Sequence, residues 1–309
     1  MDRRNFFKKS VQAGLLTGAA VAFPGFYGRY FAKPSRTIPA AYDLVAIKGG
    51  EPEVMFDEAI KMYGGMKTFV KKNQKVYLKP NIGWDVTPER GGNTNPKLVK
   101  RVIEHCFDAG AKEVYVADHT CDDWKRCYVN SGIEKVVKDS GAQMVPADTE
   151  SYYQEISVSS GKVLKNAKVH ELVLDSDVFI NMPILKNHGG ARLTVSLKNM
   201  MGVVWDRRFW HRTDLQQCIA DYATYSKRPV LNIVDAYYVM KRNGPRGVST
   251  DDVVLMKSQI LSTDMVAADA ASAKLFGIEP DDVPHITYAD AMGVGKKNLS
   301  SLNIKRIIL

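Results

Sequence analysis

The chain has 309 residues, of which 45% are hydrophobic and 25% charged, so it can bury a large core and is not a disordered protein. Its formal net charge is +9, but residues 1–32 hold five basic residues and one acidic residue, which leaves +5 for the rest. Because those remaining basic residues are scattered and not interleaved with aromatic ones, we expect no nucleic-acid partner.

Residues 1–32 have the layout of an export signal, with a basic start followed by a weakly apolar run rich in Gly and Ala. Within it, Arg3–Lys8 (RRNFFK) resembles the twin-arginine pattern. The resemblance implies export of the folded protein to the periplasm by the Tat translocase, with cleavage after Ala32 or Ala40, or tethering through an uncleaved signal. A plain membrane anchor is the alternative, although polar residues and a proline interrupt the apolar run at 11–31.

Residues 33–42 form a proline-containing linker, and residues 43–309 alternate short apolar runs with helical periods. We expect strands at residues 43–50, 75–79, 114–117, 172–180, 230–234 and 259–261. We expect helices at residues 51–63, 96–109, 214–225 and 265–276. This alternation predicts one α/β domain, with a mostly parallel sheet covered by helices on both faces in Rossmann-like layers.

Three helix starts carry capping signals. Asn95 before Pro96 is a plausible N-cap with proline at the first helical position. Thr213 and Gln216 have the spacing of a capping box, and Asp264 stands where an N-cap is expected.

The four cysteines lack the spacing that an iron–sulfur cluster or a zinc finger needs, so we expect no intrinsic iron–sulfur cluster. Cys106 and Cys218 lie among helical apolar residues and are expected in the core. Cys121 and Cys127 lie in a polar loop, where a disulfide in an oxidising compartment and two free thiols both remain open.

Polar residues gather where the predicted strands end, which is where open α/β sheets bind ligands. These residues are Lys79, Asn81, Asp118, His119, Asn181, Lys186, His188, Asp235 and Asp264. Structural roles are the alternative: Asp118 and Asp264 as helix caps, Asp235 in a turn and Lys79 in a solvated loop.

The densest group lies in residues 181–202, NMPILKNHGGARLTVSLKNMMG. We expect a strand that ends at Pro183, then a loop with Lys186 and His188, and a tight turn at the two glycines. A helix from Leu193 would aim its free N–H groups at this loop and favour a phosphate or carboxylate there.

The same residues also fit a strand, which would place Lys198 and Asn199 at its far end. A second cluster, VVWDRRFWHRTD at 203–214, predicts either a lid or rim that closes over an anionic or aromatic ligand, or a surface loop whose aromatics pack on the domain.

In order along the chain, YLKPNIGW, NTNPKLVKRVIEHCFDAGAKEVYVADH, DVFINMPILKNHGGARLTVSLKNMMGVV, STDMVAADAASAKLFGI and GVGKKN resemble the signatures of the DUF362 family. The resemblance covers roughly residue 43 to the C-terminus, and its most specific part is Lys-x-His followed by Lys-Asn. Many relatives carry a ferredoxin-like segment with two iron–sulfur clusters, whose cysteines this chain lacks. The family name implies a shared site and no particular reaction.

Three functions fit these residues: an exported enzyme or enzyme-like protein for a small anionic ligand, a periplasmic redox-associated protein that holds a metal or cofactor or docks an iron–sulfur partner, and a non-catalytic solute-binding protein. The second would use Asp118, His119 and His188 as candidate ligands. We favour the first because lysine, histidine and asparagine suit an anion better than a metal. Its catalytic candidates are His188, Lys186 and Asp118, and its ligand-binding candidates are Lys79, Asn81, Lys198, Asn199 and Asp235.

Overall fold

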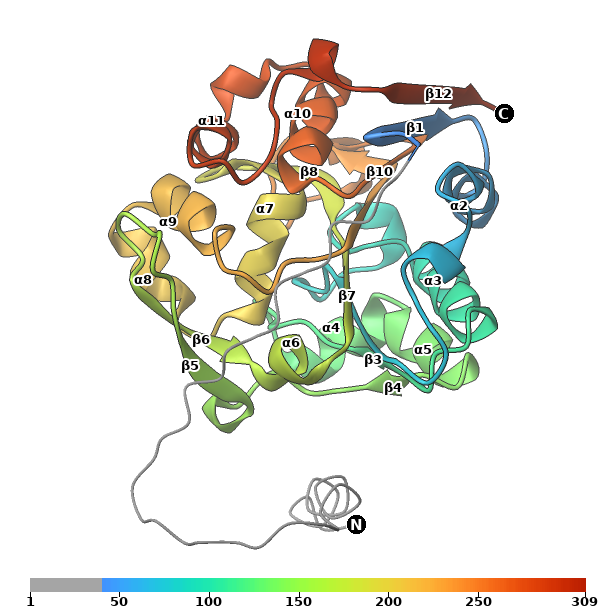
Figure 1. Ribbon diagram of the computed structural model, residues 1–309, viewed down its shortest axis with the longest axis horizontal. Coiled ribbons are helices and arrows are strands. Elements are labelled where there is room, and N and C mark those ends of the chain that lie inside the picture. Colours follow the sequence, from blue (N-terminus) through green and yellow to red (C-terminus); the bar gives the residue numbers. More distant parts are fainter. Residues whose placement is uncertain (1–40) are drawn as a thin grey trace, which may run out of the picture. The chain divides into compact units, whose positions relative to one another are not determined.

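The computed structural model describes residues 41–309, so the predicted export signal and most of the predicted linker lie outside the described residues (Figure 1). The strands are β1 (Leu44–Lys48), β2 (Lys75–Pro80), β3 (Glu113–Val116), β4 (Gln143–Met144), β5 (Tyr153–Ser157), β6 (Asn166–His170), β7 (Val178–Met182), β8 (Ile184–His188), β9 (Arg192–Thr194), β10 (Leu231–Met240), β11 (Val253–Ser262) and β12 (Ile304–Ile308).

The helices are α2 (Pro52–Lys61), α3 (Pro96–Asp108), α4 (Trp124–Asn130), α5 (Ile133–Asp139), α6 (Glu171–Asp175), α7 (Ser196–Asn199), α8 (Arg207–Arg212), α9 (Leu215–Tyr222), α10 (Met265–Phe276) and α11 (Pro284–Ala291). A 3-10 turn, η4 (Met200–Val203), directly follows α7. Within residues 41–309, none of the helices is long and apolar enough to cross a membrane.

The central sheet runs in the order β12-β1-β11-β10-β7-β2-β3-β4, with β8 and β9 attached beside β10. From β10 to β4 all neighbours are parallel, and β12 is parallel to β1. Only β11 along this path runs against both of its neighbours. The predicted mostly parallel sheet is therefore confirmed, and β5 pairs with β6 in a separate hairpin.

Helices cover both faces of this sheet, as predicted (Figure 1). In β2, Val76 and Leu78 are buried in the core that contains residues of α2, α3 and α5. Tyr77, between them, points to the opposite core, which contains residues of α7, α9 and α10, and its ring stacks on Phe179 with centroids 5.0 Å apart. Alternate side chains of one strand thus support two separate cores, as a doubly covered sheet requires.

Two of the predicted helix starts are confirmed. The side chain of Asn95 accepts a hydrogen bond from the backbone N–H of Lys97, and Asp264 accepts from the N–H groups that begin α10. The predicted capping box of Thr213 is wrong, because Thr213 still belongs to the end of α8, where its N–H bonds to the carbonyl of Phe209. Asp214 caps α9 instead, accepting from the backbone N–H of Gln217.

The strand predicted at 172–180 is wrong in its first half, where the chain forms α6 before entering β7. The side chain of His170 accepts from the N–H of Leu172 and so caps this short helix. The strands predicted at 230–234 and 259–261 are real but too short, since β10 and β11 continue as a long antiparallel pair.

Lys186 and His188 do not lie in a loop, as the sequence had suggested, but on β8. This strand pairs with β9 in an antiparallel hairpin, in which Lys186 faces Thr194 and His188 faces Arg192. The two glycines form the turn, so that part of the prediction is confirmed. The chain continues as a strand past Pro183 because β8, like β7 before it, pairs with β10 in parallel.

For the residues from Leu193 the helix alternative is wrong and the strand alternative is right at its start, since β9 includes Leu193 and α7 begins only at Ser196. Its first N–H groups are not free for an anion. The carboxylate of Asp269, from α10, accepts from Ser196 N at 2.7 Å and from Leu197 N at 3.0 Å. An internal carboxylate therefore already occupies the position where a bound ligand had been expected.

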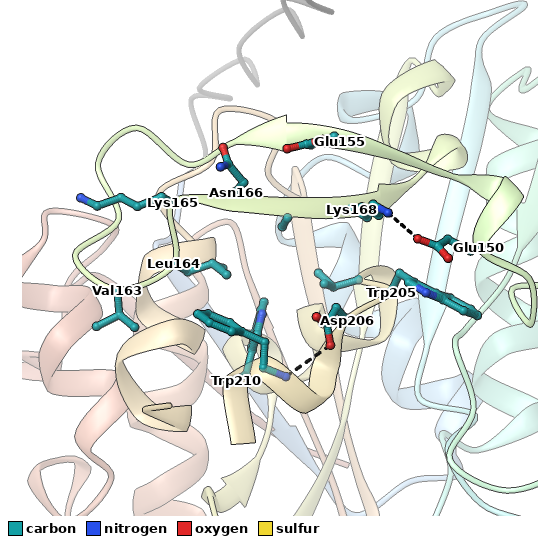
Figure 2. A pocket seen from close by; sticks show the side chains of 13 residues that line it. Glu150, Glu155, Val163, Leu164, Lys165, Asn166, Lys168, Trp205, Asp206 and Trp210 are labelled. Atoms are coloured by element: carbon teal, nitrogen blue, oxygen red, sulfur yellow. Dashed lines mark hydrogen bonds and ion pairs between the residues drawn. The ribbon is translucent and has the colours of Figure 1, made fainter. Parts of the chain in front are cut away.

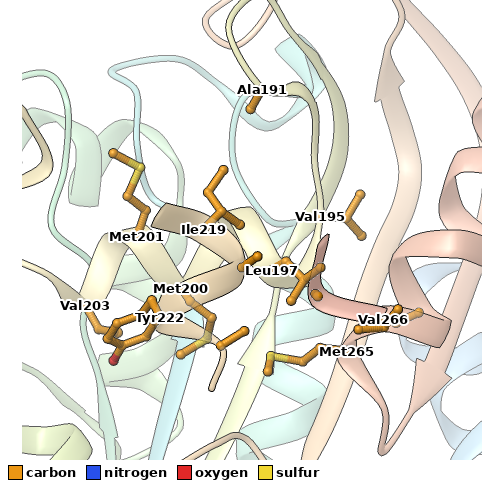
Figure 3. Packing of buried hydrophobic residues seen from close by; sticks show 14 of the residues in the cluster. Ala191, Val195, Leu197, Met200, Met201, Val203, Ile219, Tyr222, Met265 and Val266 are labelled. Atoms are coloured by element: carbon orange, nitrogen blue, oxygen red, sulfur yellow. The ribbon is translucent and has the colours of Figure 1, made fainter. Parts of the chain in front are cut away.

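The segment that carries Lys198 and Asn199 is anchored by apolar packing on its other side. Figure 3 shows Leu197 and Met200 packed among Ile219 of α9 and Met265 of α10. All four side chains are almost completely buried. Because α7 is a single turn, this packing and the bonds to Asp269 fix its position, rather than helix propensity.

Replacing Asp269 with Ala should lower the free energy of unfolding by about 2 kcal/mol or more, because two buried N–H groups lose their acceptor. Urea unfolding measures this loss. Asp139→Ala, which breaks an exposed pair with Lys135, serves as the control and should cost less than about 1 kcal/mol. Equal losses in the two variants would show that α7 does not depend on Asp269.

Candidate functional site

A cleft of about 70 Å³ lies where β2 and β3 end, between the β8–β9 hairpin, α7 and the first residue of α8. Seven of the eight predicted site residues line it: Lys79, Asn81, Asp118, Lys186, His188, Lys198 and Asn199. They come from segments more than a hundred residues apart in the sequence. The expectation that polar residues after separate strands meet at one edge of the sheet therefore holds for this group.

The floor of the cleft is a buried ion pair. Lys79 Nζ lies 2.8 Å from Asp118 Oδ1, and both side chains are almost wholly buried. The ammonium also donates to the carbonyl of Pro80 and to Asn199 Oδ1, while the second Asp118 oxygen accepts from Ile82 N. Burial lowers the pKa of Lys79, and the charge of Asp118 counteracts that shift. Asp118 is thus a partner of Lys79 and not a helix cap.

Asn199 ties the elements of the cleft together. Its amide oxygen accepts from Lys79 Nζ at 2.8 Å and from Asn81 Nδ2 at 2.9 Å. Its amide nitrogen donates to Asn181 Oδ1 at 2.8 Å and to the carbonyl of Lys79 at 3.3 Å. Since these four bonds use all the hydrogen-bonding capacity of the amide, Asn199 positions the other residues rather than offering a free group to a ligand.

Lys186 is 1% exposed and reaches the cleft from β8. Its Nζ donates to Asn81 Oδ1 at 3.0 Å and to the carbonyl of Gly92 at 2.5 Å. Burial lowers the pKa of Lys186 to about 7, and the nearby charge of Lys198 acts in the same direction. An amine in this state gains or loses a proton close to neutral pH.

Lys198 differs from the other two lysines because, among residues 41–309, its ammonium has no hydrogen-bond or ion-pair partner. The side chain is partly exposed at the cleft. Burial lowers the pKa of Lys198 to about 8, and the charges of Arg207 and Lys79 add to the effect. This cation is therefore the one most open to a ligand.

His188 faces the cleft in its neutral form. Its Nδ1 accepts hydrogen bonds from Gly190 N and Ala191 N, which leaves Nε2 to carry the proton. Burial lowers the pKa of His188 to about 2, with Lys198 and Lys186 contributing to the shift. At neutral pH the imidazole is thus a hydrogen-bond donor, and its bonds to the hairpin turn fix the orientation of the ring.

Arg207 and Cys121 also line the cleft, although neither is among the predicted site residues. Arg207 donates to the carbonyls of His119 and Thr120, and its Nη1 lies 3.6 Å from Cys121 Sγ. The Arg- and Trp-rich composition of residues 203–214 was the available signal, since a rim around an anionic ligand had been considered there. No spacing rule marked Cys121.

The aromatic part of that rim rests on His119. The rings of Trp205 and His119 stack with centroids 5.0 Å apart and planes 6° apart, and His119 Nδ1 lies 3.0 Å from the carbonyl of Val204. Burial lowers the pKa of His119 to about 4, helped by the charge of Arg207. His119 therefore packs as a neutral ring beneath Trp205.

The disulfide considered between Cys121 and Cys127 is not formed, and all four cysteines in the described part of the chain are free. Cys121 is exposed beside Arg207, whereas Cys127 is buried in α4 with its sulfur 3.8 Å from the carbonyl of Gly83. Cys106 and Cys218 are buried in the core, as predicted.

Asp235 does not line the cleft. It lies within β10, buried, and accepts hydrogen bonds from Asn95 N at 2.7 Å and Tyr237 N at 3.0 Å. Burial raises the pKa of Asp235 to about 6. Its role in the fold is to hold the start of α3 against the sheet. Within residues 41–309, His, Cys, Asp and Glu nowhere form a group of three or more that could hold a metal.

A second, larger cavity of about 510 Å³ lies between the β5–β6 hairpin and α8 (Figure 2). Its charged groups are mixed in sign and partly neutralise one another, as in the exposed pair of Lys168 and Glu150. Asp206 caps α8 by accepting from Phe209 N. Trp205 lines this cavity and stacks on His119, which lines the cleft.

Together, the mixed sheet and the lysine-rich cleft at its strand ends define an α/β protein with a buried cationic site. A family model described as "Domain of unknown function (DUF362)" matches residues 76–274, and the chain belongs to this family. It is 24% identical over 239 residues to the thylakoid-associated protein sll1697 of Synechocystis sp., covering 75% of this chain and 72% of that protein.

Two solved structures are similar, each at 12% sequence identity. The lactate racemase apoprotein from Thermoanaerobacterium thermosaccharolyticum has a TM-score of 0.47 over 75% of this chain and 56% of its own. A protein from Thermotoga maritima has a TM-score of 0.48 over 74% of this chain and 60% of its own. The chain thus spans less than two thirds of the length of either structure.

Gly202 leaves no room for a side chain, since an added Cβ would lie 2.0 Å from Asp118 Oδ1 and 2.6 Å from Lys79 Nζ. Gly202→Ala should therefore displace the ion pair and lower the free energy of unfolding by about 1–3 kcal/mol in urea unfolding. Gly189→Ala, where an added Cβ meets nothing within 4 Å, is the matched control. A Gly202→Ala protein as stable as this control would contradict the close packing described here.

Proposed function

We propose that the cleft binds a small carboxylate or phosphate anion and that the protein is an exported enzyme, or enzyme-like protein, acting on that anion. One observation supports this proposal most strongly: the ammonium of Lys198 has no partner among the described residues. It lies at a cleft where four cationic side chains meet one carboxylate. The cations are Lys79, Lys186, Lys198 and Arg207, and the carboxylate is Asp118. An anion would supply the missing negative charge.

The size of the cleft limits the ligand. Its volume of about 70 Å³ corresponds to roughly five water molecules on the same measure. A phosphate ion, or a carboxylic acid of about three carbons, has a similar number of non-hydrogen atoms. A larger ligand would have to extend past Arg207 and out of the cleft.

Each lining group has a role in this proposal. Lys198 binds the anion directly, and Nε2–H of His188 is a neutral donor beside it. Lys79, Asp118 and Asn199 hold the floor of the cleft in place. Lys186 and Lys198, with pKa values of about 7 and 8, are better suited to proton transfer at neutral pH than His188, whose pKa lies far lower.

Replacing Lys198 with Met should weaken the binding of phosphate or oxalate at least about tenfold, because a charged hydrogen bond is lost. The melting temperature without ligand should not fall, since the ammonium has no partner among the described residues. Calorimetric titration and thermal unfolding measure the two effects. Lys135→Met, at an exposed lysine, is the control and should bind as the wild type does. Undiminished binding by Lys198→Met would remove Lys198 from the site.

The proposed binding depends on pH with a definite sign. An anion needs protonated lysines, so affinity should fall as the pH rises through the pKa values of Lys186 and Lys198, about 7 and about 8. Titrations at about pH 6 and about pH 9 should differ at least about tenfold if one lysine loses its proton. Equal affinities at both pH values would contradict the involvement of these amines.

The lowered pKa values of Lys186 and Lys198 also affect the free energy of unfolding, which should rise with pH where anion affinity falls. Without ligand, the folded protein releases these protons at a lower pH than the unfolded chain, whose lysines titrate near 10.5. Between these values the unfolded state binds more protons, so this contribution to the free energy of unfolding rises with pH.

We further propose that residues 1–32 direct export to the periplasm through the Tat translocase. The RRNFFK pattern supports this proposal. Replacing Arg3 and Arg4 together with Lys should leave the protein in the cytoplasm, as measured by cell fractionation and immunoblotting. Unchanged export of the double variant would contradict it. The docking of an iron–sulfur partner stays a prediction.

A further inference from the structure

Three of the four cations that line the cleft are lysines, and the fourth is Arg207. A site evolved only to hold an anion gains more from arginine, whose planar guanidinium binds carboxylate and phosphate through two parallel bonds and stays charged. Lysine differs in that burial can remove its proton and leave a nucleophilic amine. The use of Lys79, Lys186 and Lys198 therefore points to chemistry beyond charge neutralisation.

We propose that Lys198 forms a Schiff base with the carbonyl carbon of a small 2-oxo acid bound in the cleft. This inference rests on the proposed function, since the carboxylate of the oxo acid is the bound anion. It adds a reacting group, the ketone or aldehyde carbon next to that carboxylate, and assigns the covalent step to one lysine.

Three observations select Lys198 from the three lysines. The ammonium of Lys79 is held by Asp118 and Asn199, and that of Lys186 donates to Asn81 and to the carbonyl of Gly92. Lys198 has no such partner in the described part of the chain and is partly exposed at the cleft, so a ligand can reach it.

The surroundings of Lys198 favour the neutral amine. Desolvation together with the charges of Arg207 and Lys79 lowers the pKa of Lys198 to about 8. A large share of the amine is then unprotonated near pH 8, whereas an exposed lysine with a pKa of about 10.4 is almost entirely protonated there. A lysine beside another cation is a known way to activate such a nucleophile.

The covalent step balances without an oxidant or a reductant. The nitrogen of neutral Lys198 attacks the carbonyl carbon, the nitrogen gives up a proton, and the carbonyl oxygen takes one up to form a carbinolamine. Loss of water from the carbinolamine, with uptake of a proton by the departing hydroxyl, leaves the protonated imine. Lys186, with a pKa of about 7, can exchange the protons within the same cleft.

The cleft also suits the rest of an oxo acid. Its volume of about 70 Å³ is of the order needed for the roughly six non-hydrogen atoms of pyruvate. Arg207 offers positive charge to the carboxylate, and Nε2–H of His188 offers a neutral donor. The carboxylate of the bound oxo acid therefore lies near positive charge once the imine has formed.

The test is reductive trapping of the full-length protein with pyruvate and sodium borohydride near pH 8, followed by intact-mass measurement and peptide mapping. A thermal shift with oxalate, an anion with no ketone or aldehyde carbon, reports anion binding separately. Lys198→Arg keeps the positive charge but cannot form the imine. Lys135→Arg is the control, because the side chain of Lys135 is 78% exposed. Both variants must melt like the wild type without ligand before trapping.

We expect one reduced pyruvate adduct on the wild type and on Lys135→Arg, located at Lys198, and none on Lys198→Arg. An oxalate shift without an adduct would overturn the Schiff base and leave the proposed anion site standing. An adduct that persists in Lys198→Arg, or that maps to surface lysines, would likewise overturn the assignment. Absence of both the adduct and the oxalate shift would overturn the Schiff base and the proposed function together.

Discussion

The buried ion pair between Lys79 and Asp118 is the interaction on which the cleft depends. It joins the end of β2 to the end of β3 at a distance of 2.8 Å, in a place where neither charge reaches water. Such a pair is expensive to desolvate, so it persists only where further bonds satisfy both partners. Asn199 and the backbone of Ile82 supply those bonds, and Gly202 leaves the space that the pair needs.

Asp118 is the single carboxylate that lines the cleft in the described part of the chain, so the remaining cations there lack a negatively charged partner. Asp118 offsets one positive charge, and Lys186, which is buried, and Lys198, which is partly exposed, remain next to further cations. The cost of burying these charges appears as lowered pKa values, which turns two ordinary lysines into groups that titrate near neutral pH. Anion affinity and amine reactivity then have the same origin: both follow from positive charge that the described protein groups do not balance.

The sequence was sufficient for features that depend on local pattern. The cap at Asn95, the cap at Asp264 and the layered α/β class follow from residues close together in the chain, and the structure has all three. The meeting of Lys79 and Asp118 was also foreseeable, because the parallel strands β2 and β3 end at one edge of the sheet.

Features that depend on distant partners were not predictable. Lys186 lies on a strand because β8 pairs with β10, and no local signal records that pairing. The sequence predicted free N–H groups for an anion at the start of the helix. In the structure, Asp269, more than seventy residues away, accepts hydrogen bonds from the first N–H groups of α7. Asp235 was predicted to bind a ligand because the sequence does not show its actual partner. That partner is the backbone N–H of Asn95, which is 140 residues away in the chain.

A crystal structure of the protein grown with selenate tests the proposed anion site most directly, because the selenium can be located by anomalous scattering. We expect one selenate in the cleft, within hydrogen-bond distance of Lys198 Nζ, and its loss from crystals of Lys198→Met. Selenate bound elsewhere, with the cleft filled only by water in the same crystals, would contradict the claim that the uncompensated lysines form an anion site.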